Sequence, residues 1–164
     1  MAQDDKARRL AREKSQKIWG QSREVSKHAY LDNKRINHSD IFKSIRQVRF
    51  PEDNLLLVPV RDIQGTIHSI QYIDENGKER LTKDGKIKGN FAIIGDTTKI
   101  KEGVILAENL ATAASLYQST NIPVIITFNA NNTKEVAKEL NKANFANHYV
   151  IACGATSLNS AKDA

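Results

Sequence analysis

Hydrophobic positions change their spacing twice along the 164-residue chain, and these changes divide it into three blocks. In residues 1–50, apolar side chains recur thinly at helical spacing, which predicts a helix from residue 4 to about residue 20. A second helix is predicted over residues 41–48, with Ser39 as its N-cap. We therefore predict that the first block is a helical segment.

From residue 51 the apolar positions follow the spacing of β-strands. Residues 55–60 form a continuous apolar run, and residues 66–73 alternate at period two. Residues 62–65 and 74–77 have the composition of hairpin turns. This block, residues 51–100, is predicted to be a small antiparallel β unit.

In the last block, residues 101–164, short apolar runs alternate with helical patterns of about ten residues. This order predicts a parallel βαβαβ sheet, so the fold class is α/β. The three strands would end along one edge, at Glu108, Asn129 and Cys153. We expect residues 50–164 to form one compact unit.

The composition limits the class of protein. With 40% hydrophobic and 27% charged residues, the chain resembles a soluble globular protein. Its apolar stretches are too short to span a bilayer, and its first residues lack the apolar core of a signal peptide. Cys153 is the single cysteine, which excludes an internal disulfide. We expect a cytoplasmic protein with no membrane partner.

The basic charge is concentrated in the first block. Residues 1–50 hold 13 Lys and Arg against 6 Asp and Glu, whereas residues 51–100 hold 7 against 8 and residues 101–164 hold 5 against 5. A localised basic segment is typical of a nucleic-acid-binding protein. A solvated helix face rich in Lys and Arg is an equally good interpretation.

Two groups of polar side chains are candidates for function. Arg80, Lys83, Lys86 and Lys88 surround a glycine-bearing loop, as expected of a phosphate-contacting element, and Arg46 and Arg49 would extend that basic surface. An ordinary exposed hairpin loop is the alternative. The second group lies at the predicted strand ends and comprises Glu108, Asn109, Asn129, Asn131, Asn132 and Thr156.

Glu108 is the only carboxylate of that second group. Mg²⁺ prefers hard oxygen ligands, which carboxylates supply. An acid at the start of a helix also stabilises the helix dipole without any metal. The residues alone favour this plainer interpretation of Glu108.

Several local patterns occur in a fixed order from Ser15 to Thr156. They are Ile-Trp at 18–19, His-Ala-Tyr-Leu at 28–31, Leu-Val-Pro-Val-Arg-Asp at 57–62, Ile-Leu-Ala-Glu at 105–108 and Pro-Val-Ile at 123–125. Together they resemble the Toprim-containing part of the DNA primases of conjugative plasmids and satellite phages. The resemblance implies a truncated Toprim-like sheet over residues 101–164.

The resemblance also implies a catalytic role for the position of Glu108. In the family this Glu and an Asp-x-Asp pair after the third strand bind the catalytic metal, but Gly154 and Thr156 occupy the pair's positions here. The family's Glu-Gly is Glu108-Asn109 in this chain. We therefore expect no cofactor, with Mg²⁺ only if the residual Glu108 site functions.

The favoured interpretation is a primase-derived nucleic-acid-binding module of a mobile genetic element. Its expected partners are single-stranded DNA or another nucleic acid, together with replication or conjugation proteins. Two alternatives stay open. One is an active DNA primase in which Glu108 works with other acids, such as Asp96, Glu102 or Asp163. The other is a protein–protein interaction domain.

Overall fold

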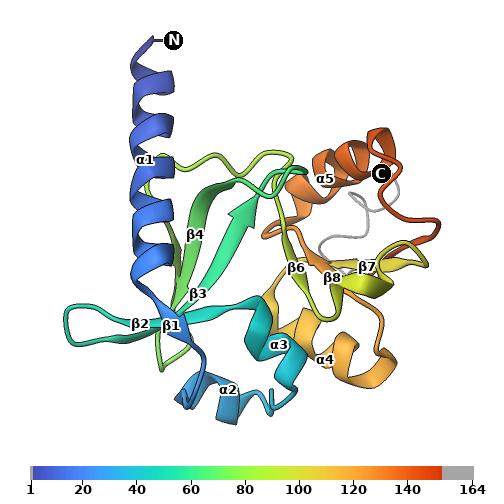
Figure 1. Cartoon of the computed structure of the whole chain (residues 1–164), viewed down its shortest axis with the longest axis horizontal. Helices are drawn as coiled ribbons and strands as arrows, with labels where there is room; N and C mark the ends of the chain where they lie inside the picture. The colour runs from blue at the N-terminus through green and yellow to red at the C-terminus, as the bar shows by residue number, and fades with distance from the viewer. Residues whose placement is uncertain (1, 153–164) are drawn as a thin grey trace. The chain divides into compact units, whose positions relative to one another are not determined.

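The computed structural model describes residues 2–152 (Figure 1). The chain divides after Ile87 into two compact units, Met1–Ile87 and Lys88–Ala164. This single division differs from the predicted boundaries near residues 50 and 100. Strand pairing explains the difference, because residues 46–49 join the sheet of the first unit and residues 92–94 join that of the second.

The first unit contains an antiparallel sheet of five strands in the order β1-β2-β3-β4-β5. The strands are β1 (Arg23–Glu24), β2 (Arg46–Arg49), β3 (Asn54–Arg61), β4 (Ile67–Ile73) and β5 (Glu79–Leu81). The antiparallel unit predicted from the alternating positions is present, and it extends at its β2 side into the first block of the sequence.

Aspartates close both predicted hairpin turns. The carboxylate of Asp62 accepts hydrogen bonds from the backbone amides of Gln64 and Thr66, at 2.9 and 3.0 Å. Asp74 accepts equivalent bonds from the amides of Asn76 and Lys78, both at 2.9 Å. The glycine that follows in each turn has a positive φ, which a side chain rarely tolerates.

Helix α1 (Ala2–Gln21) packs against β4, as the predicted helix of residues 4–20 requires (Figure 1). Its Ile18 and Trp19 cover a buried cluster on the sheet. The cluster comprises Leu55, Leu57, Ile67, Ile70 and Tyr72. The thin apolar stripe of the helix is thus buried near its carboxyl end.

The helix predicted over residues 41–48 is wrong in its second half. Two short helices, α2 (Ala29–Asn33) and α3 (Ser39–Ser44), precede β2. His38, not Ser39, caps α3 by accepting a hydrogen bond from the Asp40 amide. Residues 46–49 pair with β3 instead of continuing the helix. Pairing with a long buried strand overrides the local helical pattern there.

The second unit contains a four-stranded sheet in the order β6-β8-β7-β9. Its strands are β6 (Ala92–Ile94), β7 (Val104–Ala107), β8 (Val124–Ile126) and β9 (Tyr149–Ile151). β8 and β9 both pair in parallel with β7, as predicted, whereas β6 adds an antiparallel edge strand beside β8. A 3₁₀ turn, η1 (Thr97–Lys99), connects β6 with β7.

Two helices connect the parallel strands, α4 (Leu110–Thr120) and α5 (Ala130–Lys142). Since β8 and β9 flank β7 on opposite sides, the two crossovers run in opposite directions and place the helices on opposite faces of the sheet (Figure 1). Between residues 2 and 152, the structure has no helix that combines the length and the apolar character needed to cross a membrane.

Candidate functional site

Two predicted strand ends do meet at the carboxyl edge of the parallel sheet. Ala107 on β7 is the register partner of Ile126 on β8, so Glu108 and the residues after β8 leave the sheet side by side. Glu108 is partly exposed there. Cys153, Gly154 and Thr156, the predicted third contribution to this edge, lie outside the described residues.

The asparagines of this edge hold backbone groups in place. The Oδ1 atom of Asn109 accepts a hydrogen bond from the Thr112 amide at 2.9 Å and caps α4. The Oδ1 atom of Asn129 accepts one from the Asn132 amide at 2.8 Å and caps α5. Both oxygens thus satisfy amide donors that a helix start leaves without partners.

Asn132 has a structural role as well. It is buried, its Oδ1 atom accepts a bond from the Gly89 amide at 2.7 Å, and its Nδ2 atom donates to the carbonyls of Asn90 and Thr127, each at 2.9 Å. Asn131, in contrast, is exposed. Three of the four predicted asparagines therefore fix the local backbone, and Glu108 is the carboxylate of this edge among the described residues.

The alternative acids Asp96 and Glu102 lie at the other end of the sheet. Glu102 precedes β7, while Asp96 follows β6, which runs antiparallel to β8. The four residues of β7 span about 13 Å at about 3.3 Å per residue. Neither acid can therefore share an ion with Glu108. Asp163 lies outside the described residues.

The described residues do not complete a metal site. In residues 2–152, no three His, Cys, Asp or Glu side chains are grouped so that they could hold an ion. The carboxylate of Asp96 instead accepts bonds from the Thr98 hydroxyl and amide, at 2.7 and 2.9 Å, which lower the pKa of Asp96. This acid is part of a local turn and not of an ion site.

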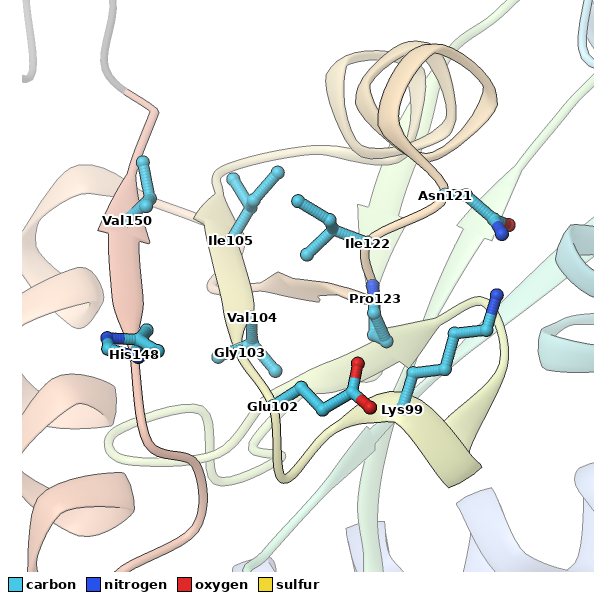
Figure 2. Close-up of a pocket in the computed structure, with 10 residues that line it drawn as sticks. All are labelled: Lys99, Glu102, Gly103, Val104, Ile105, Asn121, Ile122, Pro123, His148 and Val150. Atoms are coloured by element: carbon cyan, nitrogen blue, oxygen red, sulfur yellow. The ribbon is translucent and has the colours of Figure 1, made fainter.

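An apolar pocket of about 320 Å³ lies at the amino edge of the same sheet. Figure 2 shows Ile105, Ile122 and Val150 on one side of the sheet, with Lys99 and Glu102 at the rim. Val150 is 60% exposed and Ile122 is 39% exposed. The lining is mainly apolar and its one lysine is accompanied by Glu102, which suits apolar groups better than phosphates. Because the pocket lies before β7 and Glu108 follows it, the two sites are separate.

No pattern in the sequence predicted this pocket. The one trace of it in the sequence is the apolar residue Val150, but hydrophobic spacing alone would predict that Val150 is buried in the core. Only the strand order shows that β9 has one neighbour, β7, in the described sheet.

The predicted basic residues occupy different environments. Arg46 is partly buried and donates from Nε and Nη2 to the hydroxyl and carbonyl of Ser22, at 2.7 and 2.6 Å. Arg49 is exposed, and its Nη1 atom donates to the Glu52 carbonyl at 3.1 Å. Arg46 is therefore a structural residue in part, while Arg49 keeps an exposed cation on β2.

The other four cations follow β4 in the sequence. Arg80 on β5 is exposed and lies over the Tyr72 ring, with its Cζ atom 4.5 Å from the ring centroid. Lys83, Lys86 and Lys88 are all exposed in the connection between β5 and β6. Lys88 belongs to the second unit and the other three to the first.

A hollow of about 270 Å³ in the first unit is lined by Arg80 and by residues that the sequence did not indicate as functional. Lys14 and Lys17 of α1, Phe50 of the β2–β3 loop and Tyr72 of β4 line it with Arg80. The i, i+3 spacing of the two lysines indicates a shared helix face. No sequence signal indicates that this face meets Phe50, because that contact depends on how α1 packs on the sheet.

Comparison with known proteins places the chain near primases. No family model matches it. Two proteins of Escherichia coli, both named DNA primase TraC, are 32% and 29% identical over 99 residues. Each alignment covers 59% of this chain, which spans 7% and 9% of the relatives' own lengths.

Solved primase structures share the fold. The primase fragment of the bacteriophage T7 primase-helicase aligns over 87% of this chain and 60% of its own, with a TM-score of 0.64 and 14% identity. The catalytic domain of the DnaG primase bound to single-stranded DNA aligns over 99% and 66%, with a TM-score of 0.62 and 9% identity. The predicted resemblance to DNA primases and the mixed α/β fold are confirmed.

Proposed function

We propose that this chain is a primase-derived nucleic-acid-binding module of a mobile genetic element, and that it acts in replication or conjugation without metal-dependent catalysis of its own. The observation that carries the proposal is the uneven charge of two primase-like units. The first unit holds 18 Lys and Arg against 13 Asp and Glu, a net charge of +5, and the second holds 7 against 6, a net charge of +1.

The carboxyl edge of the second unit supports the non-catalytic part of the proposal. Among its described residues Glu108 is the carboxylate, while Asn109 and Asn129 cap helices. Cations that contact phosphates need no such constellation, because they act by neutralising the backbone and releasing counterions. A primase scaffold can therefore keep nucleic-acid binding without the family's metal-binding set.

Salt dependence of binding tests the proposal. We expect a fluorescent oligothymidylate of about twenty nucleotides to bind with an affinity that falls steeply as KCl rises. Changing Lys83, Lys86 and Lys88 together to Ala should reduce the logarithmic salt slope by about 2, since each lost contact to a single strand removes about 0.7. Fluorescence anisotropy measures both quantities.

A matched variant controls for the loss of three charges. Lys134, Lys138 and Lys142 all lie on α5, where the Nζ atoms of Lys138 and Lys142 are 3.8 and 3.9 Å from the carboxylates of Glu135 and Glu139. Their change to Ala should leave the slope almost unchanged. Wild-type binding that does not weaken with salt would instead favour a protein–protein interaction domain.

The enzymatic alternative has a direct test. An active DNA primase would synthesise primers on single-stranded DNA with Mg²⁺, and Glu108→Gln would abolish the synthesis. We expect no primer synthesis from the wild-type chain. We also expect no saturable shifts of the Glu108 and Asn109 amides in an NMR titration with Mg²⁺ or Mn²⁺. Primer synthesis that is lost in Glu108→Gln would overturn the non-catalytic part of the proposal.

A further inference from the structure

We propose that the hollow lined by Lys14, Lys17, Phe50, Tyr72 and Arg80 binds one base of a single-stranded nucleic acid, together with its neighbouring phosphates. The inference rests on the proposed nucleic-acid-binding function and specifies where a base is held. All five residues belong to the first unit. Four of them, Lys14, Lys17, Phe50 and Tyr72, lie outside the basic surface predicted from the sequence.

Helix α1 supplies the cations on one side of the hollow. Lys14 and Lys17 are one turn apart and exposed, whereas Ile18 beside them is partly buried against the sheet. The hollow is thus lined by two exposed lysines and by an apolar side chain that packs on the sheet. Lysines at a rim can reach phosphate oxygens on either side of a base that enters the hollow.

Phe50 supplies an exposed aromatic surface to the same hollow. The residue is 59% exposed, although phenylalanine is among the residue types most often buried. Its amide donates to the Asp53 carbonyl at 2.9 Å, and Arg49 donates to the Glu52 carbonyl at 3.1 Å, so hydrogen bonds fix the loop that carries the ring. An exposed aromatic ring on a loop held by hydrogen bonds is a surface on which a base can stack.

Arg80 supplies a second flat surface. Its guanidinium lies over the Tyr72 ring at 4.5 Å, and the two residues are register partners on β5 and β4. Adjacent residues of a strand point to opposite faces, so Glu79 faces away from Arg80. A guanidinium already stacked on an aromatic ring is pre-organised for a further planar group on its outer face.

The charge and size of the hollow agree with this ligand. None of the described residues that line it is an aspartate or a glutamate. Its volume of about 270 Å³ is slightly below the range of drug-sized ligand pockets, which begins at about 300 Å³. It therefore suits a single base and not a longer segment. The apolar pocket of the second unit, with one lysine, lacks this combination.

The decisive experiment separates the base from the backbone. Two fluorescent oligomers of equal length are compared, an oligothymidylate and an abasic strand that carries the same phosphates without bases. We expect Phe50→Ala to weaken binding of the oligothymidylate by about tenfold and to leave binding of the abasic strand within twofold. Because Phe50 is mostly exposed, the variant should fold, and Phe50→Trp should restore binding.

The lysines should behave differently from the ring. Changing Lys14 and Lys17 together to Ala should weaken binding of both oligomers and reduce the salt slope by about 1 to 1.5. The matched control changes Lys138 and Lys142 of α5, which removes the same charge outside the hollow and should leave both affinities within twofold.

The outcomes distinguish this inference from the function on which it rests. Wild-type binding that is salt-dependent but insensitive to Phe50→Ala would overturn the base site and leave the proposed function standing. Wild-type protein that binds neither oligomer would overturn both. A last comparison uses thymidine monophosphate as a competitor, at the same concentration of bases as the oligothymidylate. If it competes as strongly as the oligothymidylate, the ligand is a free nucleotide and the assignment to a strand is overturned.

Discussion

In the first unit, Gln47 on β2 is buried and holds the chain that enters the sheet. Its Nε2 atom donates to the Lys27 carbonyl and to Asn54 Oδ1, at 3.0 and 2.6 Å, and its Oε1 atom accepts from the Ser26 amide at 3.0 Å. In the second unit, buried Asn132 holds the backbone at Gly89, Asn90 and Thr127 in the same manner. Each unit thus fixes a loop with one amide side chain.

The surfaces of the two units differ, although each unit uses a buried amide in the same way. The first unit has a net charge of +5 and an exposed Phe50 beside lysines of α1, whereas the second is close to neutral and exposes Val150 at an apolar pocket. Similar structural devices therefore support different surface chemistry. The difference leads us to propose nucleic-acid binding for the antiparallel unit, although Glu108, the candidate catalytic residue that the sequence suggested, lies at the parallel sheet.

The largest expected effect concerns the packing of the second unit. Gly95 has a φ of +109°, and a Cβ atom there would collide with the ring of Tyr117. Gly95→Ala should lower the free energy of unfolding by about 3 kcal/mol, because both the conformation and the space exclude a side chain. In the first unit, Gly20 of α1 has no neighbour within 4 Å of such an atom, so Gly20→Ala should be neutral or stabilising. Urea denaturation compares the two variants.

The two buried amides should have similar effects. Gln47→Ala and Asn132→Ala should each lower the free energy of unfolding by about 2 kcal/mol, because each leaves buried backbone groups without partners. Chemical denaturation of both variants provides the measurement. A loss below about 0.5 kcal/mol at either site would break the parallel between the units at that site.

A smaller effect depends on pH in the first unit. Burial alone raises the pKa of Asp62, but hydrogen bonds from His68 at 2.8 Å and from the Thr66 and Gln64 amides outweigh it and lower the pKa. A lowered carboxyl pKa stabilises the fold above the unfolded value of 3.8, and that stability disappears as pH falls through the folded pKa. We therefore expect Asp62→Asn to cost about 1 kcal/mol at pH 7 and almost nothing in strong acid.

Asp74→Asn is the matched control for that measurement. Asp74 accepts the same two kinds of amide bond, from Asn76 and Lys78, so the difference between the variants reports on His68. Thermal unfolding from pH 7 into strong acid follows both. An equal loss in the two variants at pH 7 would show that the His68 bond adds nothing to the turn.

The smallest effect is expected at Glu108. If this acid only complements the start of α4, Glu108→Gln should cost about 0.3 kcal/mol and the loss should diminish in high salt. Addition of Mg²⁺ should leave the melting temperature of the wild-type chain unchanged, because an ion bound to the folded state alone would raise it. If Mg²⁺ raises the melting temperature and Glu108→Gln removes that rise, this edge of the sheet does bind a metal ion.

Local sequence patterns were sufficient to predict many of the secondary-structure elements. The composition of residues 62–65 and 74–77 predicted the two hairpins, because aspartate and glycine there satisfy turn geometry without help from distant residues. The alternation of strands and helices after residue 100 predicted the parallel sheet for a similar reason. The sequence also predicted that one edge of the sheet carries Asn109, Asn129 and Asn132. That these side chains cap helices or hold a loop could be learned only from the hydrogen bonds of the structure.

The sequence by itself determined the hairpin turns, the long basic helix α1, the parallel strands and the concentration of charge in the first block, since each depends on residues close together in the chain. Only the tertiary structure decided that residues 46–49 form a strand, that β6 joins the second sheet and that Lys14 and Phe50 line one hollow. These features depend on which distant segment offers a partner. Strand pairing and side-chain burial between distant segments can reverse a weak local preference. The spacing of residues within one segment does not predict such pairing or burial.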